Sequence, residues 1–118
     1  MKFEDLDVWK RVSRLSVDIY KNRAGLNDYG FRDQLTRASL STPSNIVEGF
    51  ERESVKEFLK FLSYIKGSCA EVRTQIYIGI EIGYIGKKIG KDWIQETIEI
   101  SSMLAGLIKT KRKQIREP

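Results

Sequence analysis

Residues 54–80 read SVKEFLKFLSYIKGSCAEVRTQIYIGI, and apolar residues in this stretch recur at steps of three and four. That spacing places them on one face of an α-helix. The stretch opens with Ser54 and Glu57, which predict a capping box, because the two side chains can satisfy free amides of the first helical turn. One long helix therefore organises the fold, and its apolar face is formed by Val55, Phe58, Leu59, Leu62, Ile65, Cys69, Val72, Ile76 and Ile80.

The segment 76–82, IYIGIEI, also alternates with a period of two and is rich in β-branched residues, which favours a strand. However, the helical face continues through Ile76 and Ile80, and no second strand is available for pairing. We therefore expect a helix. On a helix, Ile78, Ile82 and Ile85 lie away from the main apolar face, which predicts that these three residues form an oligomer interface.

Three further segments have helical spacing. The first runs over about residues 5–22, with Val8, Trp9, Val12, Leu15 and Ile19 on its apolar face. The second runs over about residues 31–50 and should bend at Pro43, because proline has no amide proton and crowds the carbonyl of Ser39. The last begins at Asp92, just past Gly90, with a predicted apolar face of Ile94, Ile98, Leu104 and Ile108.

The composition fits one domain. The chain has 118 residues, of which 41% are hydrophobic and 31% charged. Residues 1–108 hold all four predicted helices, and residues 109–118 form a basic C-terminal tail. Four amphipathic helices joined by short turns predict an all-α protein, and the core could close as a bundle.

Several kinds of chemistry are excluded by composition. Histidine is absent and Cys69 is the single cysteine, which excludes His-dependent triads, His/Cys zinc sites and an intramolecular disulfide. We expect no catalytic residues, no metal and no cofactor. The glycines 79, 83, 86 and 90 lack the Gly-Lys-Ser/Thr of a phosphate loop, and their helical spacing favours close approach of a neighbouring helix or fraying toward a turn at Lys87-Lys88.

The location of the protein is predicted from what interrupts its apolar runs. Charged residues break every run before the length of a membrane span, so no membrane partner is expected. The N-terminal MKFEDLD is acidic and unlike a signal peptide. The unpaired Cys69 suits a reducing compartment, and we expect a cytoplasmic protein.

A family resemblance rests on Gln34-Leu35-Thr36-Arg37-Ala38 and the following Ser41-Thr42-Pro43-Ser44-Asn45-Ile46-Val47-Glu48-Gly49. Further matching positions span nearly the whole chain: Phe3 to Trp9, Tyr29-Gly30-Phe31, Arg52, Glu57-Phe58, Phe61-Leu62, Gly67-Ser68 and Glu71. With these motifs the sequence resembles the four-helix-bundle proteins encoded in intervening sequences of 23S rRNA genes.

The resemblance implies an antiparallel up-and-down four-helix bundle that assembles into a homo-oligomeric ring, a pentamer. It also implies a fold related to the accessory protein of diversity-generating retroelements, which engages nucleic acid and a reverse transcriptase. A reverse-transcriptase-like or other protein partner is therefore a further expectation. The activity of the family is itself undefined.

A polar stripe is predicted on two helices. Arg37, Ser41, Asn45, Glu48 and Arg52 recur at steps of three and four, as do Tyr64, Ser68, Glu71 and Gln75. One interpretation is an acid/base site with Glu48 and Glu71 as paired carboxylates. The favoured interpretation is structural, an interhelical hydrogen-bond network that fixes helix register, because no nucleophile or metal-ligand set accompanies the carboxylates. Its members are Arg37, Asn45, Glu48, Arg52, Ser68 and Glu71.

The charge distribution is the most informative functional feature. Residues 109–118 carry five basic residues against Glu117, a net +4 of the chain's +5. In an up-and-down bundle, Lys21 and Arg23 would share the opposite end with a second basic group. The predicted nucleic-acid-binding residues are therefore Lys109, Lys111, Arg112, Lys113 and Arg116 at one end, and Lys87, Lys88 and Lys91 at the other.

Two functions follow from these features. The leading hypothesis is a non-enzymatic oligomeric scaffold that binds the backbone of RNA or DNA electrostatically, since phosphate binding grows with the number of neutralised charges. Base stacking is not expected, because no aromatic residues are interleaved with the C-terminal basic ones. The alternative is a protein–protein interaction adaptor with no nucleic-acid role, whose charge serves solubility.

Overall fold

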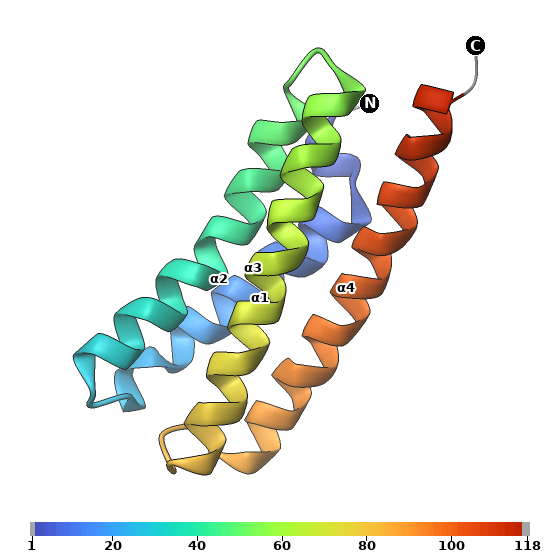
Figure 1. Ribbon diagram of the computed structural model, residues 1–118. Helices are drawn as coiled ribbons and strands as arrows, with labels where there is room; N and C mark the ends of the chain where they lie inside the picture. The colour runs from blue at the N-terminus through green and yellow to red at the C-terminus, as the bar shows by residue number, and fades with distance from the viewer. Residues whose placement is uncertain (1, 117–118) are drawn as a thin grey trace.

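The computed structural model describes residues 2–116, and its four α-helices are joined by short turns (Figure 1). They are α1 (Asp7–Asn22), α2 (Tyr29–Phe50), α3 (Val55–Glu81) and α4 (Lys87–Arg116), with short 3-10 helices at Phe3–Asp5 and Arg23–Gly25. Successive helices run in opposite directions. The predicted all-α, up-and-down four-helix bundle is therefore confirmed.

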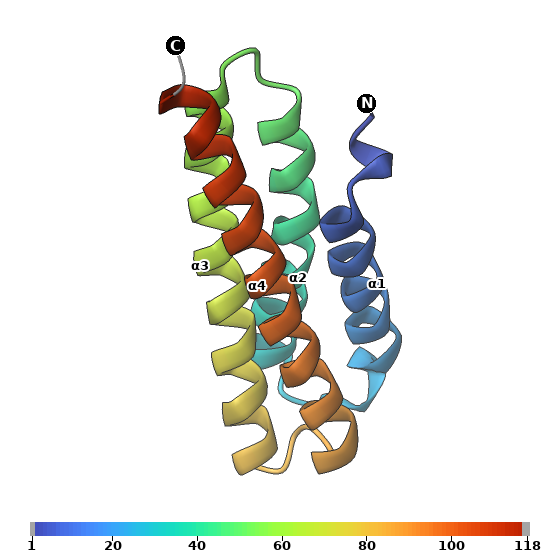
Figure 2. The same cartoon turned by 90° about the vertical axis from the view of Figure 1, so that its right-hand side faces the viewer.

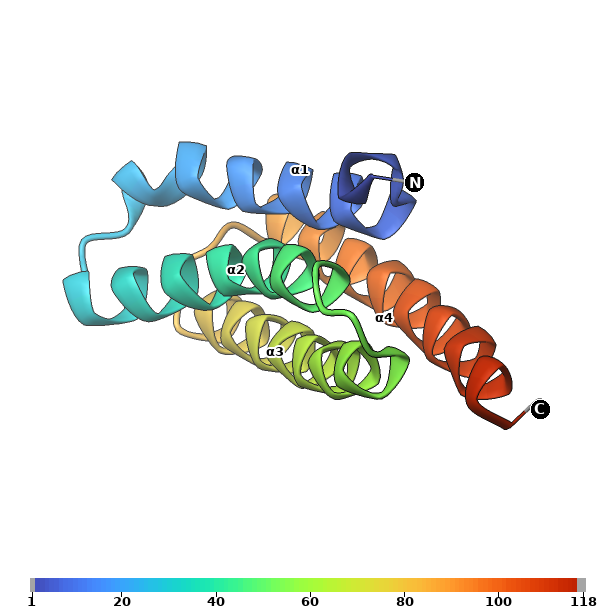
Figure 3. The same cartoon turned by 90° about the horizontal axis from the view of Figure 1, so that it is seen from above.

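The bundle is elongated, at 53 × 21 × 20 Å. Each helix packs against the next in sequence, and α1 also packs against α4, although less extensively (Figure 2). Because α1 is 16 residues long and α4 is 30, only the first half of α4 lies beside α1. Seen from above, the last turns of α4 leave α1 behind and are accompanied by α3 alone (Figure 3).

The helix starts follow the sequence signals. The side chain of Asp28 accepts a hydrogen bond from the amide of Phe31 at 3.0 Å, which caps α2. Ser54 caps α3, accepting from the amide of Glu57 at 3.2 Å, which is one of the two hydrogen bonds of the predicted capping box. The segment 76–81 is helical, so the strand-like pattern is overridden by packing along α3.

The core is built from the predicted apolar faces of α1 and α3, from buried residues of α2 such as Leu35 and Ile46, and from α4, where one predicted core residue is wrong. Ile98 is exposed, whereas Thr97 and Ile100 are fully buried. Ile98 lies at the edge of the core face, whose centre is formed by Thr97, Ile100 and Leu104. The helix also begins earlier than predicted, at Lys87 instead of Asp92, and continues through Gly90. The face of α4 toward the core is therefore Trp93, Ile94, Thr97, Ile100, Leu104 and Ile108.

Pro43 lies inside α2 and leaves a carbonyl free. A residue with an amide at this position would donate to the carbonyl of Ser39, four residues earlier. Instead, the buried hydroxyl of Ser16 on α1 donates to that carbonyl at 2.7 Å. The missing intrahelical bond is thus replaced by a bond that joins α1 to α2.

The turn between α3 and α4 buries Ile85. Gly83 has a φ of +80°, a left-handed conformation that favours glycine. The amides of Tyr84 and Ile85 then donate to the carbonyl of Gly79 at 2.8 and 3.0 Å. A Cβ on Gly79 would lie 2.5 Å from the side chain of Ile85, which packs directly on this glycine. The prediction that Ile85 is an interface residue is therefore wrong, because the turn folds it into the core.

None of the helices within residues 2–116 combines the length and hydrophobicity that crossing a membrane would require.

Candidate functional site

The basic residues gather at the two ends of the bundle. Lys21 ends α1, Arg23 follows it, and Lys87, Lys88 and Lys91 begin α4, so all five belong to the lower end in Figure 1. All five are exposed. The guanidinium of Arg23 lies 5.1 Å from the centre of the Tyr20 ring and donates to the Tyr20 carbonyl. This end of the bundle thus presents a cluster of exposed cations.

The C-terminal basic residues continue α4 and do not form a separate tail. The helix runs to Arg116, so residues 109–116 extend the bundle, while 117–118 lie outside the described residues. The side chain of Arg116, a predicted nucleic-acid ligand, is likewise outside the described part. The domain division at residue 108 therefore marks a change in charge within one helix.

Helical geometry divides the C-terminal cations between two faces of α4. Lys111 turns inward, and its Nζ lies 5.8 Å from the centre of the Phe58 ring. Lys109, Arg112 and Lys113 line a groove of about 420 Å³ between α3 and α4. We call this the basic groove, and its lining residues are Ser63, Lys66, Ala105, Ile108, Lys109, Arg112 and Lys113.

Sequence reasoning missed Lys66 and Ser63 as members of this groove. The antiparallel course of α3 and α4 brings residues 63–66 opposite residues 105–113. The antiparallel order of the two helices predicts that these segments meet, but the charge pattern of residues 109–118 alone does not include Lys66.

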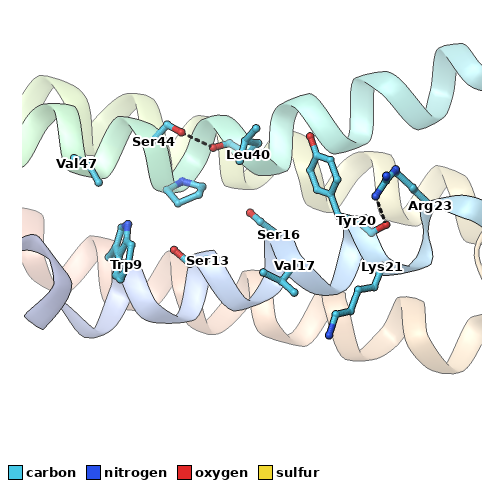
Figure 4. A pocket seen from close by; sticks show the side chains of 11 residues that line it. Trp9, Ser13, Ser16, Val17, Tyr20, Lys21, Arg23, Leu40, Ser44 and Val47 are labelled. Carbon is cyan, nitrogen blue, oxygen red and sulfur yellow. Dashed lines mark hydrogen bonds between the residues drawn. The ribbon is translucent and has the colours of Figure 1, made fainter.

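A second groove lies between α1 and α2 and is apolar (Figure 4). It has a volume of about 640 Å³. We call it the apolar groove, and its lining residues are Trp9, Ser13, Ser16, Val17, Tyr20, Lys21, Arg23, Leu40, Pro43, Ser44 and Val47. Val17 and Leu40 are each about half exposed, at 49% and 50%. Sequence analysis did not select these residues, because neither helix shows a second apolar face by itself.

The outer surface of α3 also carries apolar residues. Ile78 and Tyr77 are 49% and 54% exposed, and Ile82 at the end of the helix is 52% exposed. Glu81 lies among them and is exposed. Of the three predicted interface residues, Ile78 and Ile82 are thus available to a partner, and Ile85 is not.

The polar stripe does not join α2 to α3. Glu48 on α2 accepts from Arg52, which lies two residues past the end of the helix, at 3.1 Å, and Asn45 donates to the carbonyl of Ser41 within α2. Among the described residues, no hydrogen bond links the stripe of α2 to that of α3, and the predicted interhelical network is wrong. The reason is exposure, since Arg37, Glu48, Arg52 and Glu71 face outward and Ser68 is half-buried. The buried Oε1 of Gln75 has no hydrogen-bond partner in this part of the chain.

A register-fixing network exists between α3 and α4 instead. Arg73 donates through Nε to the hydroxyl of Thr97 at 2.9 Å, and through Nη2 to the carbonyl of Thr97 and to Ser101. Ser101 in turn contacts Cys69, whose thiol is buried. Burial raises the pKa of that thiol. Cys69 therefore behaves as a core residue, as its position on the apolar face predicted.

An ion-pair cluster joins α1 to α4. Arg11 donates through Nη2 to Glu96 at 3.0 Å and to Glu99 at 3.1 Å. Hydrogen bonds to Glu96 and Glu99 raise the pKa of the Arg11 guanidinium, and the hydrogen bond from Arg11 lowers the pKa of Glu99. These groups are partly exposed, so the cluster aligns two helices and adds modest stability.

A metal site is not formed by the residues that the structure describes, where no three His, Cys, Asp or Glu side chains gather. Gly79 and Gly90 are accounted for by packing. A Cβ on Gly90 would lie 2.5 Å from the side chain of Ile80, so α4 approaches α3 closely here. The close helix approach predicted for the glycine run is therefore present at these two positions.

The chain is similar to a known protein family and to a solved structure. The family model described as 23S rRNA-intervening sequence protein matches residues 4–106. A crystal structure from Bacteroides thetaiotaomicron, described as a protein with unknown function from the S23 ribosomal protein family, has a TM-score of 0.80. It is 21% identical, and the match covers 86% of this chain and 98% of that chain, which shows a shared fold. Neither description indicates an enzyme, and no curated protein matches the chain.

Proposed function

Because the chain belongs to the 23S rRNA-intervening sequence protein family, we propose that it is a non-enzymatic, homo-oligomeric scaffold that binds the phosphate backbone of RNA or DNA. The observation that carries the proposal is the basic surface on the last turns of α4. Its groove-lining cations make no ion pair among the residues described. Unpaired cations on a rigid helix are available to phosphates, and each contact releases counterions.

Binding is expected to be electrostatic and insensitive to sequence. No aromatic side chain lines the basic groove, so bases have no stacking platform there. The cations at the other end, Lys87, Lys88 and Lys91, offer a second contact surface. Assembly would multiply both surfaces, and multivalent contacts raise the apparent affinity without new interactions within one subunit.

The homo-oligomer is supported by two apolar surfaces of different shape. One is the apolar groove of α1 and α2, and the other is the convex outer face of α3 with Tyr77, Ile78 and Ile82. Charge supports their pairing, because Lys21 and Arg23 line the groove and Glu81 lies beside Ile82. Contact between two different patches is heterologous and closes into a ring when the rotation permits. A pentamer is the form that the family resemblance implies, and the unpaired Cys69 supports a cytoplasmic location.

The test combines affinity with mass. Fluorescence anisotropy with labelled RNA and DNA oligonucleotides should show affinity that falls linearly with the logarithm of salt concentration. Light scattering should give the mass of an oligomer with and without RNA. Absence of binding in dilute buffer would contradict the nucleic-acid role, and a monomer at micromolar concentration would contradict the assembly.

The alternative is a protein–protein adaptor, and the apolar groove favours it. An exposed apolar patch of this kind marks a protein-binding surface. If the wild-type protein assembles but binds neither RNA nor DNA at low salt, the adaptor function is the one that remains. Its partner, reverse-transcriptase-like or other, would then be sought with the assembled protein.

A further inference from the structure

The basic groove combines features that a diffuse basic surface lacks. It is a recess between two packed helices, and four cations enter it from both sides: Lys66 from α3, and Lys109, Arg112 and Lys113 from α4. Ser63 adds a hydroxyl donor at its edge. Ala105 also lines the groove, and its short side chain leaves room between the cations. Hydrogen-bond donors from α3 and α4 therefore line the same recess.

The charge of this volume is uncompensated. The ion pairs among the described residues engage Arg11, Arg32 and Arg52, none of which lines the groove. No carboxylate is among the lining residues. Like charges gathered in a recess repel one another, so the recess favours a ligand that brings several negative charges.

We propose that the basic groove is a docking site for the phosphodiester backbone of a single-stranded nucleic acid, and this proposal rests on the nucleic-acid role proposed above. A volume of about 420 Å³ admits a phosphate with its sugar. A flexible strand can bend its backbone into such a recess. A duplex holds its phosphates on a stiff cylinder, which reaches only the rim.

Only some cations of the C-terminal basic segment line the groove. Lys111 belongs to the same basic segment, but it lies against Phe58 and does not line the groove. Lys66 is 43 positions earlier than Lys109 and yet lines the groove. A groove site therefore depends on Lys66 more than on Lys111, whereas diffuse electrostatics would depend on both equally.

The experiment uses the full-length protein and a labelled oligouridine in an anisotropy titration across salt concentrations. Lys66→Gln and Lys111→Gln remove the same formal charge and form a matched pair. Loss of one phosphate contact lowers the salt slope by about 0.7, which is roughly eightfold in affinity at about 50 mM salt and roughly threefold at about 200 mM. We expect this loss for Lys66→Gln and a change within about twofold for Lys111→Gln.

A second variant tests the recess without removing a cation. Ala105→Glu places a carboxylate on the exposed floor of the groove, where helix propensity tolerates it. It should weaken oligouridine binding at least as much as Lys66→Gln, and inorganic pyrophosphate should compete with oligouridine for the wild-type protein. Circular dichroism melting confirms that each variant remains folded.

The outcomes are distinct. Equal losses for Lys66→Gln and Lys111→Gln would overturn the groove and leave the scaffold function standing. Absence of binding by the wild-type protein would overturn both. A duplex of equal length that shows the same difference between the two lysine variants would overturn the single-strand assignment.

Discussion

Two of the grooves on the bundle have opposite chemistry. The groove between α1 and α2 is lined by apolar side chains such as Val17 and Leu40, and the groove between α3 and α4 is lined by Lys66, Lys109 and Arg112. Both are gaps along a seam between adjacent antiparallel helices. The difference therefore arises from the residues at the seam and not from the architecture.

The contrast assigns different partners to the two seams. An apolar recess gains free energy when protein covers it, because apolar surface leaves water. A cationic recess is well hydrated and gains when polyanions replace its counterions. Assembly and ligand binding should therefore be separable by mutation, and the following predictions test this separation.

The largest effect is expected at the apolar groove. Leu40→Glu should dissociate the homo-oligomer, because it would bury an unpaired carboxylate at the contact. Leu40 is half exposed in the single chain, so the bundle itself should remain folded. Ile82→Glu on α3 should have the same effect if the two surfaces meet.

Light scattering measures this outcome as a fall from the mass of the oligomer to the 13.7 kDa of one chain. Lys66→Gln is the control, since it alters the other groove and should leave the mass unchanged. An intact oligomer for both Leu40→Glu and Ile82→Glu would place the subunit contact elsewhere.

A smaller effect is expected from deleting residues 109–118. Folding should survive, because the last buried residue of α4 is Ile108. The deletion removes five basic residues, and the slope of log affinity against log salt should fall in magnitude by about 2 to 4. The loss should be large in dilute salt and fade as salt rises.

The same titration on a Lys87→Gln, Lys88→Gln double variant provides the comparison, since it neutralises cations at the opposite end. The deleted protein should keep its oligomeric mass, because the apolar groove is intact. An unchanged salt slope after the deletion would move the binding site to the Lys87, Lys88 and Lys91 end.

The architecture was predictable because burial along one helix face depends on local spacing. Val55 to Ile80 keep one period for seven turns, and this outweighed the β-branched pattern at residues 76–82. The start of α4 was not predictable by the same argument. The sequence predicts the helix start just past Gly90, but Gly90 lies inside α4, where the side chain of Ile80 leaves no room for a Cβ.

The two grooves depend on residues from different helices, and that is why the sequence showed only half of each. Lys109, Arg112 and Lys113 were visible as a basic run, whereas Lys66 becomes relevant only when the register of α3 against α4 is known. The network of Arg73 with Thr97 and Ser101 was missed for the same reason. The spacing of the polar stripe identifies residues on one face of a helix, but it does not identify the helix that packs against that face.

The smallest effect is expected at that polar stripe, which lines neither groove. Glu48→Gln removes an exposed ion pair between Glu48 and Arg52 at the C-terminal end of α2, worth about 0.3–0.5 kcal/mol, and should lower Tm by about 1–3 °C. Arg73→Gln, which breaks hydrogen bonds between α3 and α4, should cost about 1–3 kcal/mol and serves as the comparison. Glu48→Gln should alter neither the oligomeric mass nor the oligonucleotide affinity. A hydrolytic activity that disappears in Glu48→Gln while Tm stays constant would contradict this and assign Glu48 a catalytic role.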